Sequence, residues 1–459
     1  SGRRPTHRGN SRAPNRGYTG YGNHGSVRDY FHDVSDGALT YTNFVPTAYF
    51  RAPQPKSYYD STAMPYGQGA RILIQAALVA LNNSGFDFSQ YDSNGDGYVD
   101  ALNAFYAGEP SLGWSEGLWP HSSSIYYAAD GVSTNRYQIT NIGSGLSLGT
   151  FCHENGHMLC FWPDLYDYDS DSSGVGRFCL MCNSGPSNNP VEPSAPLKDL
   201  AGWTSSMTVL TGVSNALPVS AGVNQFYKVA NPARANEYYM IENRQASGRD
   251  ASLPDVGLAV WHVDTNGSNS DQDQTPTSHY FCTLVQADGR WDLENHVGAG
   301  DNTDLWAAPT HVLLTPETSP AATWWSGADA PVYLDQISAS GPTMTFNYRE
   351  APGSLSVSIA IQPAGLAAPW RLDGPNGYLV TGTGDAGLLV SDEGDYTLTW
   401  LPVPGWSSPA PSVVTAAVSA TGTPPAFAGV YTNPPFVTAG GGSVGDTGAG
   451  RGVTLVDVD

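Results

Sequence analysis

Hydrophobic residues recur at helical spacing in three segments of the chain. In residues 26–34 the apolar positions repeat at three- and four-residue intervals, and Ser26 followed by Asp29 matches a capping box. Residues 68–82 are apolar over most of the helical surface, which is typical of a buried helix. A third helix is predicted over residues 150–162.

Further along the chain, apolar and polar residues alternate in short runs bounded by Gly and Pro, the pattern of β-strands. Strands are predicted at 98–107, 137–141, 225–230, 237–242, 257–263, 280–287, 343–348, 355–361 and 395–400. Helices are concentrated in the first part of the chain and strands in the second. The pattern therefore predicts an α+β fold with a β-rich second half.

The length of 459 residues allows about two to four domains. A change of texture near residue 204 and a Pro-Gly break at 351–353 supply candidate boundaries. The predicted regions are a flexible Arg/Gly-rich lead-in at 1–25, a core region at 26–203, a β-rich continuation at 204–350, an Ig-like β-sandwich at 354–431 and a Gly-rich tail at 432–459, which resembles a truncated propeller-type repeat.

The charge balance excludes some classes of partner. Lys and Arg number 20 against 42 Asp and Glu, a formal net charge of −22. Phosphate contact needs clustered basic residues, so a nucleic-acid-binding protein is not expected. No apolar run reaches the roughly 20 residues of a membrane helix, so no membrane span is expected.

Five cysteines are present, and four of them cluster between residues 152 and 182. In an oxidising compartment, the clustering favours a disulfide among these four, with the others remaining as buried thiols. The spacing of Cys179 and Cys182 would also suit a redox pair or half of a zinc knuckle.

The strongest chemical signal is the sequence HENGH at 153–157. On a helix, His153 and His157 lie one turn apart on the same face, so that both imidazoles can bind one metal ion. Glu154 would then stand beside an open coordination position, where it can take a proton from water activated by zinc. The alternative is a helix with two surface histidines and a glutamate.

Several sequence blocks accompany this motif. In chain order they are GSVRDYFHDVSDG at 25–37, SYYD at 57–60, YDSNGDGYVDALNAFYAG at 91–108, LWPH at 118–121, PDLYDYD at 163–169, LKDLAGW at 197–203, EYYMIENRQ at 237–245 and GLAVWHVD at 257–264. In this series, residues 20–350 resemble the immune inhibitor A-like family of secreted metallopeptidases, which are of metzincin type.

The resemblance implies a zinc metalloendopeptidase, a hydrolase of protein or peptide substrates, with its catalytic core in residues 26–203. It also implies a bacterial protein that is secreted or at the cell surface and is made with a propeptide, to which no segment of this chain is assigned. Glu154 would be the general base. Met181, in a turn of small residues, would form the hydrophobic floor under the metal ligands.

The third zinc ligand is less clear, because the chain departs from the usual metzincin pattern. Cys160 stands where that pattern has Gly, and Pro163, which has no donor atom, stands at the ligand position. By resemblance to the PDLYD block we expect Asp164 to be the ligand, with Asp167 as the nearer alternative and Glu192 as a distant one. Asp164 could instead be a turn residue after proline.

A second metal site is predicted in the loop that precedes the first strand. Oxygen-bearing residues stand at positions 1, 3, 5 and 9 of an EF-hand-like pattern, with Gly97 at position 6. The calcium ligands would be Asp92, Asn94, Asp96, the carbonyl of Tyr98, and Asp100. Asn103 occupies the position of the usual Glu, and an Asp/Gly-rich hairpin turn is the alternative.

Other polar residues receive simpler interpretations. His121 is expected to be structural or to lie behind the metal ligands. The acidic residues Asp288, Asp292, Asp301 and Asp304 could form a cation site, but solvated loop charge is the preferred interpretation.

Two other functions remain open. The first is a non-catalytic adhesive or ligand-binding surface protein built on a degenerate metalloprotease fold, which Cys160 and Pro163 favour. Glu154 argues against it, because a binding module needs no general base between two metal ligands. The second is a metallohydrolase acting on glycans or other non-peptide substrates.

Overall fold

The computed structural model describes residues 22–46, 49–143, 145–270, 278–350, 355–390, 393–419 and 423–433. The chain divides into two compact units, with the boundary between Pro352 and Gly353. The predicted lead-in and tail lie largely outside the described residues. Among the residues described, no helix has the length and apolar character needed to cross a membrane.

Strands far outnumber helices in the described part of the chain, as expected for a β-rich α+β protein. The helices are α1 (Val27–Val34), α2 (Lys56–Tyr59), α3 (Gln68–Asn83), α4 (Leu148–Cys160) and α5 (Ala195–Leu200), with 3-10 turns η2 (Phe88–Tyr91), η3 (Gly176–Phe178), η4 (Gly248–Ser252) and η5 (Pro375–Gly377). The capping box predicted for α1 is confirmed, because Ser26 and Asp29 each accept the backbone N–H of the other.

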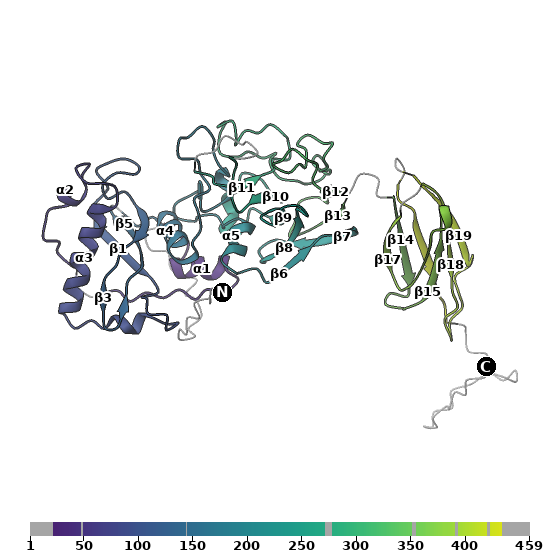
Figure 1. The fold of residues 1–459 in the computed structure, drawn as a ribbon, viewed down its shortest axis with the longest axis horizontal. Helices are drawn as coiled ribbons and strands as arrows, with labels where there is room; N and C mark the ends of the chain where they lie inside the picture. The colour runs from purple at the N-terminus through teal and green to yellow at the C-terminus, as the bar shows by residue number, and fades with distance from the viewer. Residues whose placement is uncertain are drawn as a thin grey trace, which may run out of the picture. The chain divides into compact units, whose positions relative to one another are not determined.

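A three-stranded sheet positions the helix that carries the HENGH motif (Figure 1). Its order is β1 (Leu102–Ala107), β5 (Arg136–Ile142) and β2 (His121–Ser124), with β1 parallel and β2 antiparallel to β5. Side chains alternate between its faces. Tyr106 and Ile139 pack with Ile74 of α3, whereas Phe105 meets Phe151 of α4 at 4.8 Å between ring centroids. The sheet is thus sandwiched between α3 and α4.

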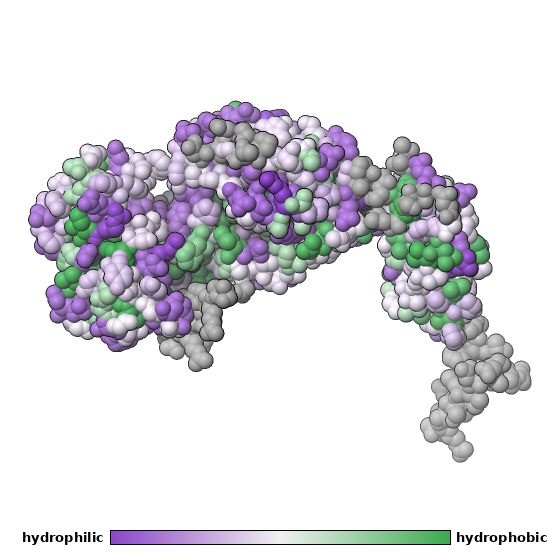
Figure 2. Space-filling view, viewed as in Figure 1, coloured by the Kyte–Doolittle hydropathy of each residue, from purple (hydrophilic) through white to green (hydrophobic). Residues whose placement is uncertain are grey.

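The prediction that α3 is buried over most of its surface is wrong. Ala70, Ile74 and Leu78 are buried, but Ile72 and Val79 are 37% and 42% exposed. A helix that packs on one face of a sheet buries one stripe and leaves the other to solvent. Figure 2 shows hydrophobic residues among hydrophilic ones on the visible surface around α3.

The second half of the first unit consists of two sheets. One has the order β11 (Cys282–Leu284), β10 (Gly257–Asp264), β9 (Glu237–Arg244), β8 (Gln225–Ala230) and β6 (Ser206–Val209). The other has the order β12 (Tyr333–Asp335), β13 (Thr343–Arg349) and β7 (Val213–Ser220). In the first half of this unit, between β2 and β5, β3 (Ala128–Ala129) and β4 (Val132–Ser133) form a short separate hairpin. Every residue of β9 and β10 is buried, since α5 packs on these strands and apolar clusters cover both faces.

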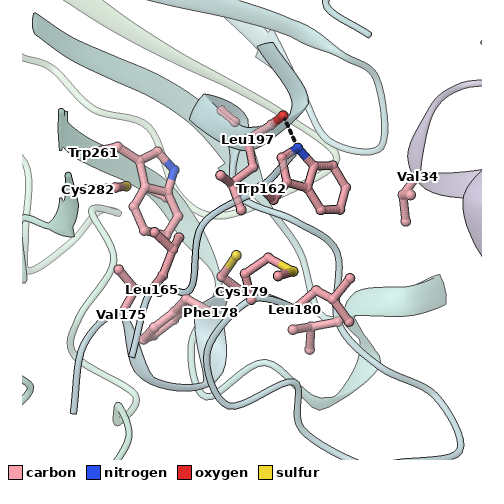
Figure 3. Close-up of a cluster of buried hydrophobic side chains, with 14 of the residues drawn as sticks. Val34, Trp162, Leu165, Val175, Phe178, Cys179, Leu180, Leu197, Trp261 and Cys282 are labelled. Atoms are coloured by element: carbon pink, nitrogen blue, oxygen red, sulfur yellow. Dashed lines mark hydrogen bonds between the residues drawn. The ribbon is translucent and has the colours of Figure 1, made fainter. Parts of the chain in front are cut away.

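One hydrophobic cluster joins the helical and strand-rich halves of this unit. It includes residues of α1, α4, α5, β9, β10 and the segment between α4 and α5 (Figure 3). Trp162 lies in it and donates its indole N–H to the carbonyl oxygen of Leu197 at 2.7 Å. The regions 26–203 and 204–350 therefore share a core.

The C-terminal unit consists of two packed sheets. Its strands are β14 (Leu355–Gln362), β15 (Pro369–Asp373), β16 (Leu379–Thr383), β17 (Ala386–Val390), β18 (Gly394–Trp400), β19 (Val413–Val418) and β20 (Ala426–Val430). The sheet orders are β17-β14-β20 and β16-β15-β18-β19. Both sheets contribute to a single apolar cluster, which includes Ile359, Trp370, Leu398 and Phe427, and the arrangement is a β-sandwich.

The predicted disulfide is wrong, because all five cysteines are free. The thiols are directed into separate contacts. Cys182 donates to the carbonyl oxygen of Ser173 at 3.3 Å, and Cys179 lies 3.8 Å from the hydroxyl of Ser194. Burial raises the pKa of the Cys182 thiol to about 12, which also makes it a poor redox partner for Cys179.

Candidate metal centre

Helix α4 brings the two histidines of HENGH to one face. Ser147 caps its start by accepting the N–H of Thr150, and the chain leaves the helix at Phe161, whose φ is +59°. The predicted helix therefore begins and ends slightly earlier than expected. The Nε2 atoms of His153 and His157 lie 3.2 Å apart.

Backbone carbonyls fix the orientation of both rings. His153 Nδ1 donates to the carbonyl oxygen of Leu180 at 3.2 Å, and His157 Nδ1 donates to that of Trp162 at 2.6 Å. In the neutral rings the proton is thus on Nδ1, and each Nε2 presents a lone pair to the other. Metal-binding histidines are commonly held in this way.

Asp164 completes the group. Its Oδ1 lies 3.0 Å from His153 Nε2 and 3.1 Å from His157 Nε2. This oxygen is buried and accepts no hydrogen bond while the two rings are neutral, whereas Oδ2 accepts the hydroxyl of Tyr168 at 2.6 Å. Three lone-pair atoms therefore face one another, an arrangement that a bound cation satisfies. The donor set fits a metal ion.

Without a cation, the group must take up a proton. Burial lowers the pKa of His153, but the bond to Asp164 and the charges of Glu154 and Asp164 outweigh this effect and raise it to about 9. Burial raises the pKa of Asp164, but the two imidazoles outweigh it and bring the pKa far below the usual range. Both shifts show how strongly this site favours positive charge.

Glu154 lies beside the group and is only 6% exposed. Burial raises its pKa, against the opposing effect of the two histidines, and its carboxylate is held by the backbone of Ser122 in β2. A carboxylate with a raised pKa is a better proton acceptor at neutral pH.

Met181 lies against the back of α4 and is fully buried. A Cβ added at Gly156 would stand 2.9 Å from Met181 Sδ and 2.7 Å from Trp162 Cε3, closer than real Cβ atoms come. Leu165 N–H donates to the Met181 carbonyl oxygen at 2.7 Å. The methionine turn thus supports both the helix and the segment that carries Asp164.

Aromatic residues near the group were not singled out from the sequence. Tyr168 binds Asp164, the ring of Tyr166 stacks on His153 at 6.2 Å, and Trp114 meets Tyr168 at 5.3 Å. The spacing of four residues between Asp164 and Tyr168 was a usable signal, because it fits a turn that brings the two side chains together.

The alternative third ligands lie elsewhere. Asp167 is grouped with Asp169 and Asp171, and Glu192 pairs with Lys198. Of the three carboxylates considered for the histidine group, Asp164 is the one that reaches it.

The loop at 92–100 has a different character. Asp92 accepts the backbone N–H groups of Gly95, Asp96 and Gly97, and Asp96 accepts that of Tyr98. Asn94 accepts the N–H of Asp96 and donates to its carboxylate, while Asp100 accepts the N–H of Ser93. The carboxylates therefore hold the loop in a turn, and calcium binding here stays a prediction.

His121 is buried and has both ring nitrogens engaged, by the carbonyl of Trp119 at 2.7 Å and the hydroxyl of Tyr137 at 2.9 Å. These contacts suit a structural histidine.

The acidic set at 288–304 is only partly solvated, contrary to expectation. Asp288, Asp301 and Asp304 converge, Asp292 is not among them, and Asp304 is 1% exposed. Burial, followed by the charges of Asp301 and Asp288, raises the pKa of Asp304 to about 7. Arg290 pairs with Asp288 and Asp301.

In comparisons with known proteins, the chain matched no family model, no curated protein and no solved structure.

Proposed function

We propose that this protein is a zinc-dependent endopeptidase of metzincin type, related to the immune inhibitor A-like metallopeptidases. One observation carries the proposal. The Nε2 atoms of His153 and His157 and one carboxylate oxygen of Asp164 converge beside the buried carboxylate of Glu154.

The donor set supports zinc. Catalytic zinc sites use three protein ligands and leave a position open, and His153, His157 and Asp164 supply three. Two histidines and a carboxylate can also hold ferrous iron. The glutamate between the two histidines favours hydrolysis over oxygen chemistry, because a hydrolytic site needs a base next to the water.

When bound, zinc would polarise a peptide carbonyl and lower the pKa of a water molecule. Glu154 then accepts a proton from that water as it attacks, and donates the proton to the amine nitrogen of the leaving group. Burial of Glu154 keeps the proton from exchanging freely with solvent during this transfer. Met181 takes no part in the chemistry and supports α4.

The position of β2 supports an extended peptide substrate. This strand ends the sheet order β1-β5-β2, so in the described residues one of its edges pairs with β5 and the other has no partner strand. Ser122 of β2 holds Glu154. A peptide added to this edge would make backbone hydrogen bonds and bring its scissile bond towards the catalytic carboxylate.

Zinc stoichiometry and proteolysis together test the proposal. Elemental analysis of the wild type and of Glu154→Ala should each give one zinc per chain. Casein cleavage should fall by about 100- to 10,000-fold in the variant, because a general base typically contributes that much. Glu393→Ala, at an exposed position of the C-terminal unit, should leave cleavage unchanged.

The other outcomes are equally informative. One zinc in both proteins with no cleavage by either would favour the non-catalytic binding protein. Iron, or no metal at all, would refute the zinc centre.

A further inference from the structure

A second group of potential ligands follows the metal centre in the chain. Asp167, Asp169 and Asp171 alternate with other residues, and one carboxylate oxygen from each lies within 4.8 Å of the others. Asp169 and Asp171 are exposed, whereas Asp167 is only 6% exposed. Carboxylates at such distances repel one another unless positive charge is placed between them.

The buried member of the group has an oxygen without a donor. Asp167 Oδ2 accepts the N–H of Ser172 at 3.0 Å, but Oδ1 is buried and accepts no hydrogen bond. Leaving a charged oxygen buried and unsatisfied is costly, so such atoms call for a ligand. This oxygen is evidence for a ligand beyond the mere proximity of three acids.

The rest of the first unit holds this segment in place. The N–H of Tyr168 donates to the carbonyl oxygen of Ser270 at 2.8 Å, and that of Ser173 donates to the carbonyl oxygen of Leu293 at 2.7 Å. These bonds fix the backbone between Asp167 and Asp169 and again just after Asp171. The fold therefore restrains the carboxylates from moving apart.

We propose that Asp167, Asp169 and Asp171 bind a calcium ion, separately from the zinc centre. All three side-chain donors are carboxylate oxygens, the ligands that hard cations prefer over imidazole or thiolate. Calcium tolerates the irregular geometry of an exposed loop, whereas magnesium demands an almost ideal octahedron and retains its waters. Backbone carbonyls and water would complete the coordination shell.

The calcium ion would also brace the metal centre. Tyr168 stands between two of the aspartates, and its hydroxyl donates to Asp164 Oδ2 at 2.6 Å. Fixing the loop fixes this tyrosine and thereby the orientation of Asp164. This coupling rests on the proposed function, whereas the calcium site itself does not.

Calorimetric titration of the calcium-depleted full chain with CaCl2 tests the site. The double variant Asp169→Asn, Asp171→Asn should lose one equivalent of bound calcium relative to the wild type, and each single variant should bind that equivalent at least about tenfold more weakly. Asp395→Asn, an exposed change in the C-terminal unit, is the control. Asp92→Asn, Asp96→Asn removes the other predicted calcium loop and should leave this equivalent intact.

Thermal unfolding provides a second readout. Calcium should raise the Tm of the wild type more than that of the double variant, while without calcium the variant should melt at or above the wild type, because like charges have been removed. Unchanged calcium binding in the double variant would overturn the proposal, and so would an equal affinity for MgCl2. Zinc content and casein cleavage of the same samples test the coupling to the metal centre, which can fail while the calcium site itself is upheld by the titration.

Discussion

The group on α4 and the loop at 92–100 both match metal-binding spacings, yet they are built in opposite ways. In the first, the N–H groups of His153 and His157 point away towards carbonyls, and bare lone pairs face inward with Asp164. In the second, Asp92 and Asp96 accept N–H groups of their own loop. The first arrangement is unfavourable without a cation, whereas the second is already largely satisfied by the backbone.

This difference teaches that a metal centre is defined by donor atoms with no proton between them. Residue spacing shows which side chains can share a face, but the direction of each lone pair depends on what the rest of the chain offers. The experiments below test that distinction, beginning with the loss of the metal centre itself and ending with the smallest expected effect.

Removing Asp164 should abolish the metal centre. Asp164→Ala leaves two imidazoles without the carboxylate, so zinc affinity should fall by at least about 100-fold, more than the loss of a supporting residue costs. Competition with a zinc-specific chromophoric chelator measures this directly. Asp167→Asn should keep far more of the zinc affinity than Asp164→Ala does, and equal zinc loss in both variants would contradict the assignment of Asp164.

Added volume beneath the metal centre should destabilise the fold more than added volume at an open glycine position. Gly156→Ala pushes a methyl group against Trp162 and Met181, so the free energy of unfolding should fall by about 1–3 kcal/mol. Urea denaturation measures it. Gly113→Ala is the matched control, since nothing lies within 4 Å of a Cβ there. Equal effects at the two positions would show that Met181 does not press on α4.

The acidic group at 288–304 is intermediate between the histidine group and the loop at 92–100. The negative charge of its buried member is only partly balanced, so the stability of the fold should depend on pH here. The pKa of Asp304 is about 7 in the folded chain and 3.8 in the reference state, so the stability it contributes is present below about pH 4 and is lost as the pH rises through 7. With divalent cations chelated, Asp304→Asn should therefore be more stable than the wild type at pH 8, by up to about 4 kcal/mol.

The gain in Asp304→Asn should shrink markedly at pH 5, where the folded wild type carries the proton. Denaturation at the two pH values gives the comparison, and a gain of the same size at both would show that charge at Asp304 is not the cause.

The smallest effect is expected in the loop at 92–100. Asp92→Asn, Asp96→Asn keeps oxygen acceptors for the backbone N–H groups, so zinc content should not change and casein cleavage should stay within about twofold. Loss of zinc in this variant would mean that the loop and the metal centre are coupled.

Local patterns predicted the elements well. The capping box of α1, the helix of the HENGH motif and the alternating strands β8, β9 and β10 all follow from periodicity and from cap residues. These features depend on neighbours within a few residues, which a sequence shows directly. The spacing of His153 and His157 likewise sets two histidines on one helical face.

Features that depend on distant contacts could not be predicted in the same way. The exposure of Ile72 and Val79 follows from which side of α3 the sheet covers. The free cysteines follow from where separate segments meet. The position of Asp164 beside the two histidines depends on the chain reversal at Phe161. No residue pattern predicted the positive φ of this residue.

The reactivity of the five thiols can also report local unfolding of the hydrophobic core. Four are buried, Cys182 is half-buried, and all five lie in or against the hydrophobic cluster that joins α4 to the strands. Since burial suppresses the thiolate form, an alkylating reagent should react with these thiols only when the cluster transiently unfolds and exposes them. Mass spectrometry of the labelled chain would therefore measure the rate of local unfolding in the core beneath the metal centre, without any engineered probe.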